Sequence, residues 1–382
     1  MQAAFLCMRR LSKPSTKGGS MSYARFGEGD VYVFMSNVGL ECCGCWLQDR
    51  EWVEDETAFF RGYFRSIGEI VETTFDSTWG MIAHLDRHRA AGHHVPRGVD
   101  ADLWRDDAEN FPRNEHKRSL PHGGTEYGDR EVALSGEILR TVVGSGVHGI
   151  AIEGTDDHDE LGIYVEPEHW VLGPLQHRDD FVWRTQAEGA RSTHGDTDLV
   201  MYALAKYLRL AIKGNPTVLL PLFAPEDSVL YSTPFGDELR RIRSAFLSQQ
   251  AIERFLGYAQ SQHERMLGAS KRGVPNRPEL IAKHGWDVKY GSHALRLAYQ
   301  GLELASDSTL TLPMPAESRE RVLAVKRGEV PRDEVSAGIS SLTSKVRMLL
   351  DEGRTVLPQR PDLDRITRYA VETQRGFWAM NR

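Results

Sequence analysis

Long hydrophobic runs are absent from this sequence of 382 residues. No stretch approaches the roughly eighteen apolar residues that a membrane-spanning helix requires, and residues 1–20 contain basic side chains but no apolar segment of signal-peptide length. Export and membrane spanning are therefore not expected. Cysteine is also scarce, with four in the chain, and three of them crowd together at Cys42, Cys43 and Cys45. This crowding does not suggest a disulfide framework, so we expect a protein of the reducing cytoplasm.

Basic residues are fewer than acidic ones, with 47 Lys and Arg against 54 Asp and Glu, so the formal net charge is −7 at pH 7. A net negative chain is not expected to coat nucleic acid through bulk electrostatics, although a local basic groove could still bind an RNA end. The composition, 40% hydrophobic and 26% charged, is that of a globular chain. Its length is sufficient to bury about two or three cores.

An acidic segment is the most informative feature that is present. Residues 141–165 contain five acids and no Lys or Arg. Asp157 and Asp159 are separated by one residue and precede an alternating apolar pattern, so both carboxylates should lie on one face of a strand. At about 4 Å and an effective dielectric of about 20, two such charges repel by about 4 kcal/mol. Binding of Mg²⁺ or Mn²⁺, which prefer oxygen ligands, would replace this repulsion with attraction.

A glycine and a serine follow the preceding strand pattern, which covers residues 138–143. Gly144 would allow the backbone to bend closely past a phosphate, and Ser145 adds a hydroxyl and backbone donors. Both are candidate nucleotide-binding residues. The alternative is an acidic surface turn, because Gly-Ser pairs and Asp-rich loops are common.

A third carboxylate should come from a neighbouring strand. Asp198 is the best candidate and Asp196 is the reserve, since both precede an amphipathic helical pattern that runs from Met201 to Gly214. Asp196 could instead cap that helix.

Positive charge is concentrated downstream, in residues 265–296. Lys289, His293 and Arg296 are spaced i, i+4 and i+7, so they form one polar stripe if residues 288–304 are helical. This stripe could face a cleft and contact a triphosphate, or it could be a solvated helix face. Lys206 and Lys213 follow the strand of Asp198 and are further candidates for phosphate contact.

The N-terminal part contains soft metal ligands. Cys42 and Cys45, with His84 and His88, have the ligand spacings of a Cys₂His₂ zinc site apart from an unusually long insert. Thiolates and imidazoles suit Zn²⁺. The alternative is a turn with reduced cysteines and a helix with exposed histidines.

Residues 130–381 resemble the polymerase-beta-like nucleotidyltransferases, and within them a group of predicted nucleotidyltransferases associated with RNA ligases. The resemblance rests on these segments: Gly144–Gly149, Asp157–Asp159, Asp198–Val200 with Lys206, Lys213–Thr217, Tyr258–Gln262, His284–Leu297, Val325–Glu329, Leu357–Pro358 and Pro361–Asp362. Two departures stand out. Asp156 occupies a position where relatives usually have Ser, and Pro221 occupies one where they tend to carry Glu, which places the role of that Glu in doubt here.

The resemblance implies an α+β fold, with a small mixed sheet flanked by helices and a helical C-terminal domain. It also implies a two-metal enzyme that moves a nucleoside monophosphate from an NTP to a hydroxyl, here an RNA end, with release of pyrophosphate. Asp157 and Asp159 would bind both ions, and Asp198 would bind the ion on the nucleophile side. Alternatives are adenylyl transfer to a protein or small molecule, and an inactive zinc-containing adaptor that binds nucleic acid.

The N-terminal segment resembles small zinc-finger-like proteins of actinobacterial phages, which would place the protein in the cytoplasm of a bacterial host. We therefore expect five regions. These are a disordered arm at 1–20, a zinc-finger-like module at 21–96, a linker at 97–128, the catalytic core at 129–234 and the helical domain at 235–382.

Overall fold

The computed structural model describes residues 22–25, 29, 31–36, 39–43, 64–66, 69–71, 74–75, 77–110, 120–121, 124–152, 154, 157–268 and 277–381. The chain divides into two compact units, which are Met1–Phe111 with Arg375–Arg382, and Pro112–Gln374. The arm expected at residues 1–20 lies outside the described residues.

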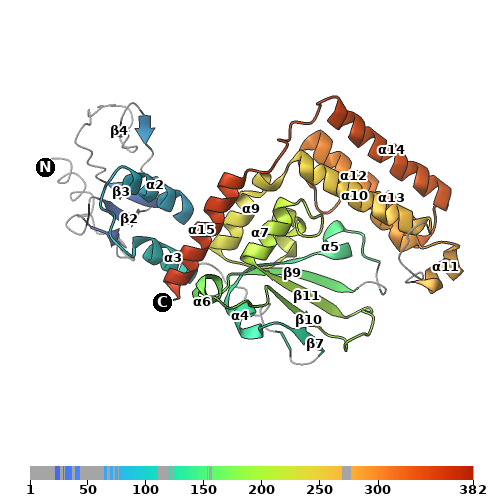
Figure 1. Cartoon of the computed structure of the whole chain (residues 1–382), viewed down its shortest axis with the longest axis horizontal. Coiled ribbons are helices and arrows are strands. Elements are labelled where there is room, and N and C mark those ends of the chain that lie inside the picture. The colour runs from blue at the N-terminus through green and yellow to red at the C-terminus, as the bar shows by residue number, and fades with distance from the viewer. Residues whose placement is uncertain are drawn as a thin grey trace. The chain divides into compact units, whose positions relative to one another are not determined.

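In the described residues before Phe111, the first unit combines a small antiparallel sheet with helices α2 and α3 (Figure 1). The strands, in sheet order, are β1 (Ser22–Ala24), β2 (Tyr32–Ser36), β3 (Gly39–Cys43) and β6 (Thr74–Phe75), and a separate hairpin pairs β4 (Phe64–Ser66) with β5 (Glu69–Val71). Helix α2 (Thr78–Ala90) begins at Ser77, whose hydroxyl accepts a hydrogen bond from the amide of Gly80 at 3.1 Å. Trp79 meets Trp104 of α3 (Val99–Asn110) edge to face, with ring centroids 5.2 Å apart. The helices thus share an aromatic core.

The stretch expected to be a linker, residues 97–128, is partly structured. Helix α3 lies within it, and Leu103 and Trp104 are each only 1% exposed. The charge, Gly and Pro content of the whole stretch indicated a loop, but apolar residues at helical spacing give residues 99–110 a face to bury. Strand β7 (Thr125–Tyr127) also lies in this stretch and forms an edge of the second unit's sheet.

A mixed six-stranded sheet organises the second unit (Figure 1). Its strands, in sheet order, are β12 (Val229–Ser232), β8 (Glu137–Val142), β9 (His158–Tyr164), β11 (Thr197–Ala203), β10 (Asp180–Arg184) and β7. Strands β9 and β11 are parallel, whereas the other neighbours are antiparallel. The strand expected at residues 138–143 is confirmed as β8, which is buried over most of its length.

One face of this sheet carries an apolar cluster. Residues at alternate positions of β9, β10 and β11 form it together with Ala133 of α4 (Arg130–Ser135); they are Tyr164, Phe181, Trp183, Leu199, Met201 and Ala203. Because strand side chains alternate between faces, Asp159 and Asp198 must project from the opposite face. The alternation therefore keeps the acidic side chains away from this core.

The helical C-terminal region is centred on α12 (Val288–Asp307), whose length allows it to pack against α10 (Gln249–Met266), α11 (Pro278–His284), α13 (Ala316–Arg327) and α14 (Arg332–Asp351). Besides these helices and α4, the described α-helices of this unit are α5 (Gly144–His148), α6 (Glu168–Leu172), α7 (Leu204–Ile212), α8 (Leu220–Phe223) and α9 (Pro234–Arg241), and α15 (Leu363–Met380) follows α14. Ala294, Leu295 and Ala298 of α12 are buried in the shared core. The expected α+β fold with a helical C-terminal part is confirmed.

The helix expected from Met201 begins later, at Leu204. Residues up to Ala203 continue β11, because Leu199, Met201 and Ala203 alternate into the buried face of the sheet. Met201 fits the strand alternation with Leu199 and also the helical spacing with Leu204, so the boundary was ambiguous in the sequence. Among the described helices, none combines the length and the apolar character that crossing a bilayer requires.

Candidate active site

Three carboxylates come together at one end of the parallel pair β9 and β11. Asp198 is paired in register with Asp159, and Asp157 immediately precedes β9. The three residues each offer a carboxylate oxygen, and these oxygens lie within 4.8 Å of one another. We call Asp157, Asp159 and Asp198 the acidic cluster. The structure brings together the three carboxylates that the sequence pattern singled out.

Gly144 lies directly against the acidic cluster. Its φ is +64°, and a Cβ added there would stand closer than 3.0 Å to Oδ2 of Asp159. The amide of Val143 donates to the carbonyl of Asp159 at 2.9 Å, which fixes the start of α5 against β9. Glycine is therefore required at residue 144 by both the backbone angle and the space. The hydroxyl of Ser145, the next residue, makes no hydrogen bond among the described residues.

Asp198 is oriented by the loop between β10 and β11. Its Oδ1 accepts a hydrogen bond from Nε2 of Gln186 at 2.7 Å, and its Oδ2 accepts one from the hydroxyl of Ser192 at 2.8 Å. Arg184, directly across the strand pair, places its Nε 3.8 Å from Oδ1 of Asp198. None of these three residues was expected from the sequence. The only signal was their position in a polar loop that returns to the strand of Asp198.

The electrostatics of the acidic cluster favour a cation. Burial, followed by repulsion from Asp157 and then from Asp198, raises the pKa of Asp159 to about 6. The positive charges of Lys289 and His158 oppose this rise. Burial and the two neighbouring carboxylates thus both disfavour the charged form of Asp159, and a bound cation would favour it.

The apparent affinity for Mg²⁺ is expected to fall by about tenfold per pH unit below about pH 6 and to be nearly constant above pH 7. The reason is that a proton on Asp159 competes with the ion, and the pKa of that carboxyl is about 6. Titration calorimetry with Mg²⁺ or Mn²⁺ between pH 5 and 8 measures this dependence. A constant affinity from pH 5 to 7 would contradict it.

A second group of side chains, on α12 and α5, brings basic and imidazole groups together. Lys289, His293 and Arg296 lie on α12, as the spacing predicted, and His148 ends α5. Arg296 Nε and His148 Nε2 are buried and have no hydrogen-bond partner among the described residues. We call these four residues the basic cluster. Because Arg296 Nε is enclosed and unsatisfied, the stripe on α12 is more than a solvated helix face.

Charges within the basic cluster perturb one another. Burial lowers the pKa of Arg296 to about 10, so its guanidinium still carries its charge at neutral pH. Burial also holds the pKa values of His293 and His148 well below the ordinary value, and the charge of Arg296 adds to this effect. Arg277 and Lys326 lower the pKa of His293 further. The two histidines are neutral at pH 7, whereas the surrounding charge is positive, and such a site favours an anion.

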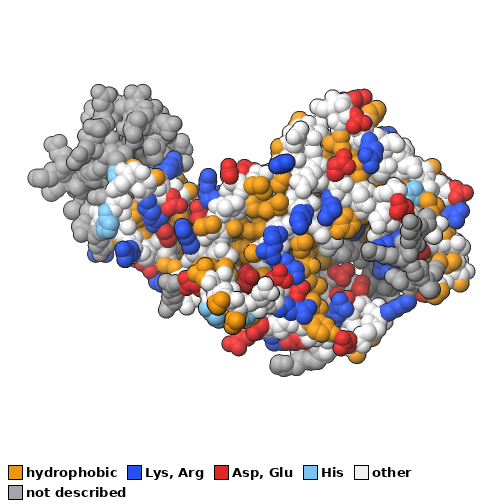
Figure 2. All heavy atoms as spheres, viewed as in Figure 1, with side chains coloured by type: hydrophobic (Ala, Val, Ile, Leu, Met, Phe, Trp, Pro, Cys, Tyr) orange, Lys and Arg blue, Asp and Glu red, His pale blue; other side chains and the backbone are white. Residues whose placement is uncertain are grey.

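The positive charge of Lys289 lowers the pKa of Asp159. Such an effect requires the two side chains to be near each other, so the basic cluster neighbours the acidic cluster. In Figure 2, acidic side chains are visible in a recess of this unit between the sheet and the C-terminal helices. Positive and negative groups of different elements therefore meet at one place, which the sequence spacing alone did not reveal.

Lys206 does not lie with these clusters. Its ammonium contacts Asp179 at 2.8 Å and Asp180 at 2.7 Å. Asp180 pairs with Tyr202, four residues along β11 from Asp198, so Lys206 is about 13 Å along the strands from the acidic cluster. The expectation that Lys206 contacts phosphate near the metal carboxylates is therefore not supported by its position.

Three other residues considered from the sequence do not add a side chain to the acidic or the basic cluster. Lys213 is exposed at the end of α7. Asp196 does not cap a helix, since its carboxylate accepts hydrogen bonds from the hydroxyls of Thr185 and Thr193, each at 2.7 Å, and closes the loop before β11. Pro221 is buried in the first turn of α8. Asp156 lies outside the described residues.

In the first unit, Cys42, His84 and His88 come together, and their ligand atoms lie within 4.8 Å of one another. Cys45, the fourth ligand expected from the spacing, lies outside the described residues.

Comparison with protein families matches residues 131–370 to a family described as RNA repair pathway DNA polymerase beta family. The chain belongs to this family. Members of the RNA repair pathway DNA polymerase beta family are polymerase-beta-like nucleotidyltransferases, so the sequence resemblance is confirmed. Curated proteins gave no significant match. A solved structure of a nucleotidyltransferase-like protein from Exiguobacterium sibiricum 255-15 aligns over 58% of this chain and 71% of that chain, with 10% identity and a TM-score of 0.23.

Family membership makes the chain an enzyme of the nucleotidyltransferase class, a class that usually uses divalent metals. The acidic cluster fits such an ion, because all three ligands are carboxylates and hard divalent cations prefer oxygen. The raised pKa of Asp159 shows that its charge is not compensated by the protein alone.

Proposed function

We propose that the protein transfers a nucleoside monophosphate from an NTP to the hydroxyl of an RNA end, with Mg²⁺ or Mn²⁺. In this reaction the hydroxyl oxygen bonds to the α-phosphorus, and the bond from that phosphorus to the bridging oxygen breaks. Pyrophosphate leaves with the electron pair of that bond, and the proton of the hydroxyl passes to solvent. The observation that carries the proposal is the register between β9 and β11, which pairs Asp159 with Asp198 and so places their carboxylates side by side.

The acidic cluster would hold two divalent ions. Bound there, the ions supply Lewis-acid activation of the attacking oxygen and charge neutralisation on the triphosphate. Asp157 and Asp159 would be shared between the ions, and Asp198 would serve the ion on the nucleophile side. Gln186 and Ser192 occupy one lone pair on each oxygen of Asp198, and so fix the direction in which the remaining lone pairs point.

The basic cluster would receive the triphosphate. Arg296 provides a charge whose Nε is enclosed and unsatisfied, and Lys289 is in electrostatic reach of both Asp159 and His293. Gly144, with the backbone of the first turn of α5, lies against Asp159 and could approach phosphate closely. The arrangement thus offers cations for the phosphates beside anions for the metals.

Replacement of Arg296 by methionine is expected to raise KM for the NTP by about 10- to 100-fold, because a hydrogen bond to a charged group contributes about 1.5–3 kcal/mol. Thermal stability without nucleotide should not fall, since the change removes a buried charge that has no carboxylate partner in the described part of the chain. Lys213→Met, at an exposed position, is the matched control and should leave KM unchanged. Equal KM values for the two variants would remove Arg296 from the nucleotide site.

An RNA acceptor is favoured by the family, whose description names an RNA repair pathway. The same three acids would also support adenylyl transfer to a protein or to a small molecule, because the acceptor is selected by the shape of the site and not by the metal ligands. A catalytically inactive adaptor is disfavoured by the intact acidic cluster.

The proposal is tested by incubating the protein with each labelled NTP, Mg²⁺ or Mn²⁺, and deproteinised RNA, in parallel with an Asp157→Asn/Asp159→Asn variant. We expect label on RNA with the wild type alone, and loss of this label when the terminal ribose hydroxyls of the RNA are removed by periodate oxidation. Label on protein or on a small molecule would overturn the RNA acceptor and retain the transferase. Equal labelling by the variant would overturn the site.

A further inference from the structure

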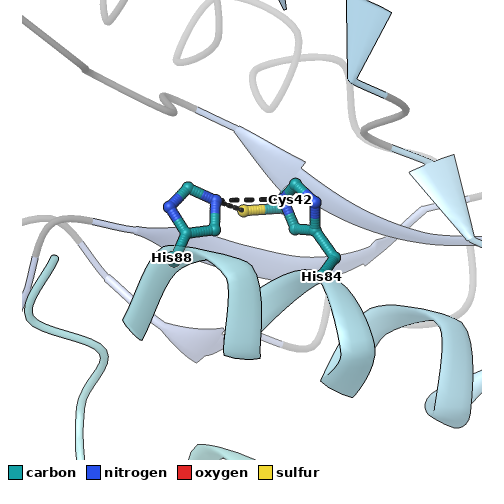
Figure 3. A group of neighbouring side chains, drawn as sticks. All are labelled: Cys42, His84 and His88. Atoms are coloured by element: carbon teal, nitrogen blue, oxygen red, sulfur yellow. Dashed lines mark hydrogen bonds between the residues drawn. The ribbon is translucent and has the colours of Figure 1, made fainter. Parts of the chain in front are cut away.

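We propose that Cys42, His84 and His88 form a zinc site in the first unit, with His93 orienting His88. The three ligands come from two elements. Cys42 lies on β3, and His84 and His88 are four residues apart on α2, which places both imidazoles on the same face of the helix. Figure 3 shows the side chains pointing toward one another between the strand and the helix.

The distances match those of a tetrahedral zinc centre. Zn–S and Zn–N bonds of about 2.3 and 2.05 Å at a tetrahedral angle place sulfur and nitrogen about 3.6 Å apart, and two nitrogens about 3.3 Å apart. Here Cys42 Sγ and His88 Nε2 are 3.8 Å apart, and His88 Nε2 and His84 Nε2 are 3.0 Å apart. One ion could therefore reach all three atoms after shifts of a few tenths of an ångström.

Burial shields the three ligands from water and leaves the fourth position of a tetrahedral ion for another ligand. Cys42 and His84 are each 1% exposed and His88 is 5% exposed, and the ring centroid of Phe75 lies 5.0 Å from that of His84. An apolar surrounding of this kind strengthens metal–ligand interactions and limits access of water. The mixed thiolate and imidazole donors favour Zn²⁺ over the hard cations that suit the acidic cluster.

His93 contacts the ring nitrogen of His88 that would not bind the metal. Its Nδ1 lies 2.7 Å from Nδ1 of His88. If Nε2 of His88 binds the ion, Nδ1 of His88 carries the proton and donates it to His93. Metal-binding histidines commonly use their other nitrogen in this way, and loss of such a partner typically weakens metal binding by about 10- to 100-fold.

A hydrogen-bonded group without metal is the competing explanation. A proton on Nε2 of His88 could be donated to His84, with Nδ1 of His88 then accepting from His93. In that arrangement the sulfur of Cys42, 3.8 Å from the same Nε2, would be a further hydrogen-bonding partner of His88. The zinc content of the protein therefore decides between the two explanations.

The test is the zinc content of the full chain, purified without an affinity tag of histidines and without chelator, by elemental mass spectrometry. We expect about one zinc per chain, and a fall of about tenfold or more for Cys42→Ser and for His84→Gln. His169→Gln, at an exposed histidine of α6, is the control and should retain zinc. Wild-type protein without zinc that also fails to bind added zinc would overturn the site, as would full zinc content in Cys42→Ser.

Two further measurements separate a lost site from a lost fold. Wild-type protein exchanged with Co²⁺ should show a thiolate-to-cobalt charge-transfer band together with the absorption of tetrahedral cobalt, and octahedral cobalt without the charge-transfer band would overturn the proposal. His93→Gln should keep the far-ultraviolet circular dichroism of the wild type while binding zinc about 10- to 100-fold more weakly. Unchanged affinity in this variant would overturn the role of His93. None of these readouts depends on nucleotidyl transfer.

Discussion

Replacement of Asp159 by asparagine is expected to reduce nucleotidyl transfer by about 1,000-fold or more. Asp159 lies in register with Asp198 and beside Asp157, so its charge would act on both metal ions. The ions contribute several kcal/mol of transition-state stabilisation, and a loss of about 4 kcal/mol corresponds to about 1,000-fold in rate. Single-turnover transfer of labelled NTP measures the effect directly.

Asp196→Asn is the matched control, because Asp196 is two residues from Asp198 but its carboxylate serves the loop. We expect this variant to keep most of its activity. The metal-free Asp159→Asn protein should also be more stable than the wild type by about 1 kcal/mol at pH 7.5. The pKa of Asp159 is raised above its unfolded value, so its charged form is disfavoured in the fold above about pH 6, and the neutral amide avoids that cost. An active Asp159→Asn protein would exclude the proposed site.

Replacement of Gly144 by alanine is expected to reduce transfer by about 100-fold or more. The new methyl group would overlap Oδ2 of Asp159 and push the carboxylate out of the acidic cluster. A displacement of about 1 Å at a catalytic group can cost about 100-fold in rate. The variant should also bind Mg²⁺ more weakly, which titration calorimetry would detect.

Gly353→Ala isolates the contribution of the backbone. Gly353 has a φ of +63°, nearly the same as the +64° of Gly144, but nothing lies within 4 Å of the Cβ it would gain. Both variants should lose a similar conformational contribution of about 1 kcal/mol in unfolding free energy, whereas only Gly144→Ala should lose activity. Similar activity in the two variants would contradict the contact between residue 144 and Asp159.

The core of the acidic cluster could be predicted from the sequence because it depends on local geometry. Asp157 and Asp159 share a face through the period of a strand, and the structure places them together. Asp198 was predicted from its place in another strand pattern, although the register that aligns it with Asp159 depends on a parallel pairing across the sheet. That pairing is a tertiary property and carries no local signal.

Other contacts could not be predicted for the same reason. Lys206 is close to Asp198 in the sequence. The two residues nevertheless lie at opposite ends of β11, a strand of seven residues. The loop residues Gln186 and Ser192 contact Asp198 only because β10 and β11 form a hairpin. The helical spacing of Lys289, His293 and Arg296 predicted their shared face, whereas the burial of Arg296 Nε became evident only from packing.

The sheet has opposite electrical characters at its two ends. At one end Lys206, Arg178 and Arg209 pair with Asp179 and Asp180, and at the other burial and the neighbouring carboxylates raise the pKa of Asp159. At the second end the acidic cluster would repel a free triphosphate while the neighbouring basic cluster attracts it, and a bound cation would cancel the repulsion and leave the attraction. Binding should therefore be ordered, with the divalent ion arriving first or as the NTP complex. Nucleotide association should be slower in metal-free buffer than with Mg²⁺.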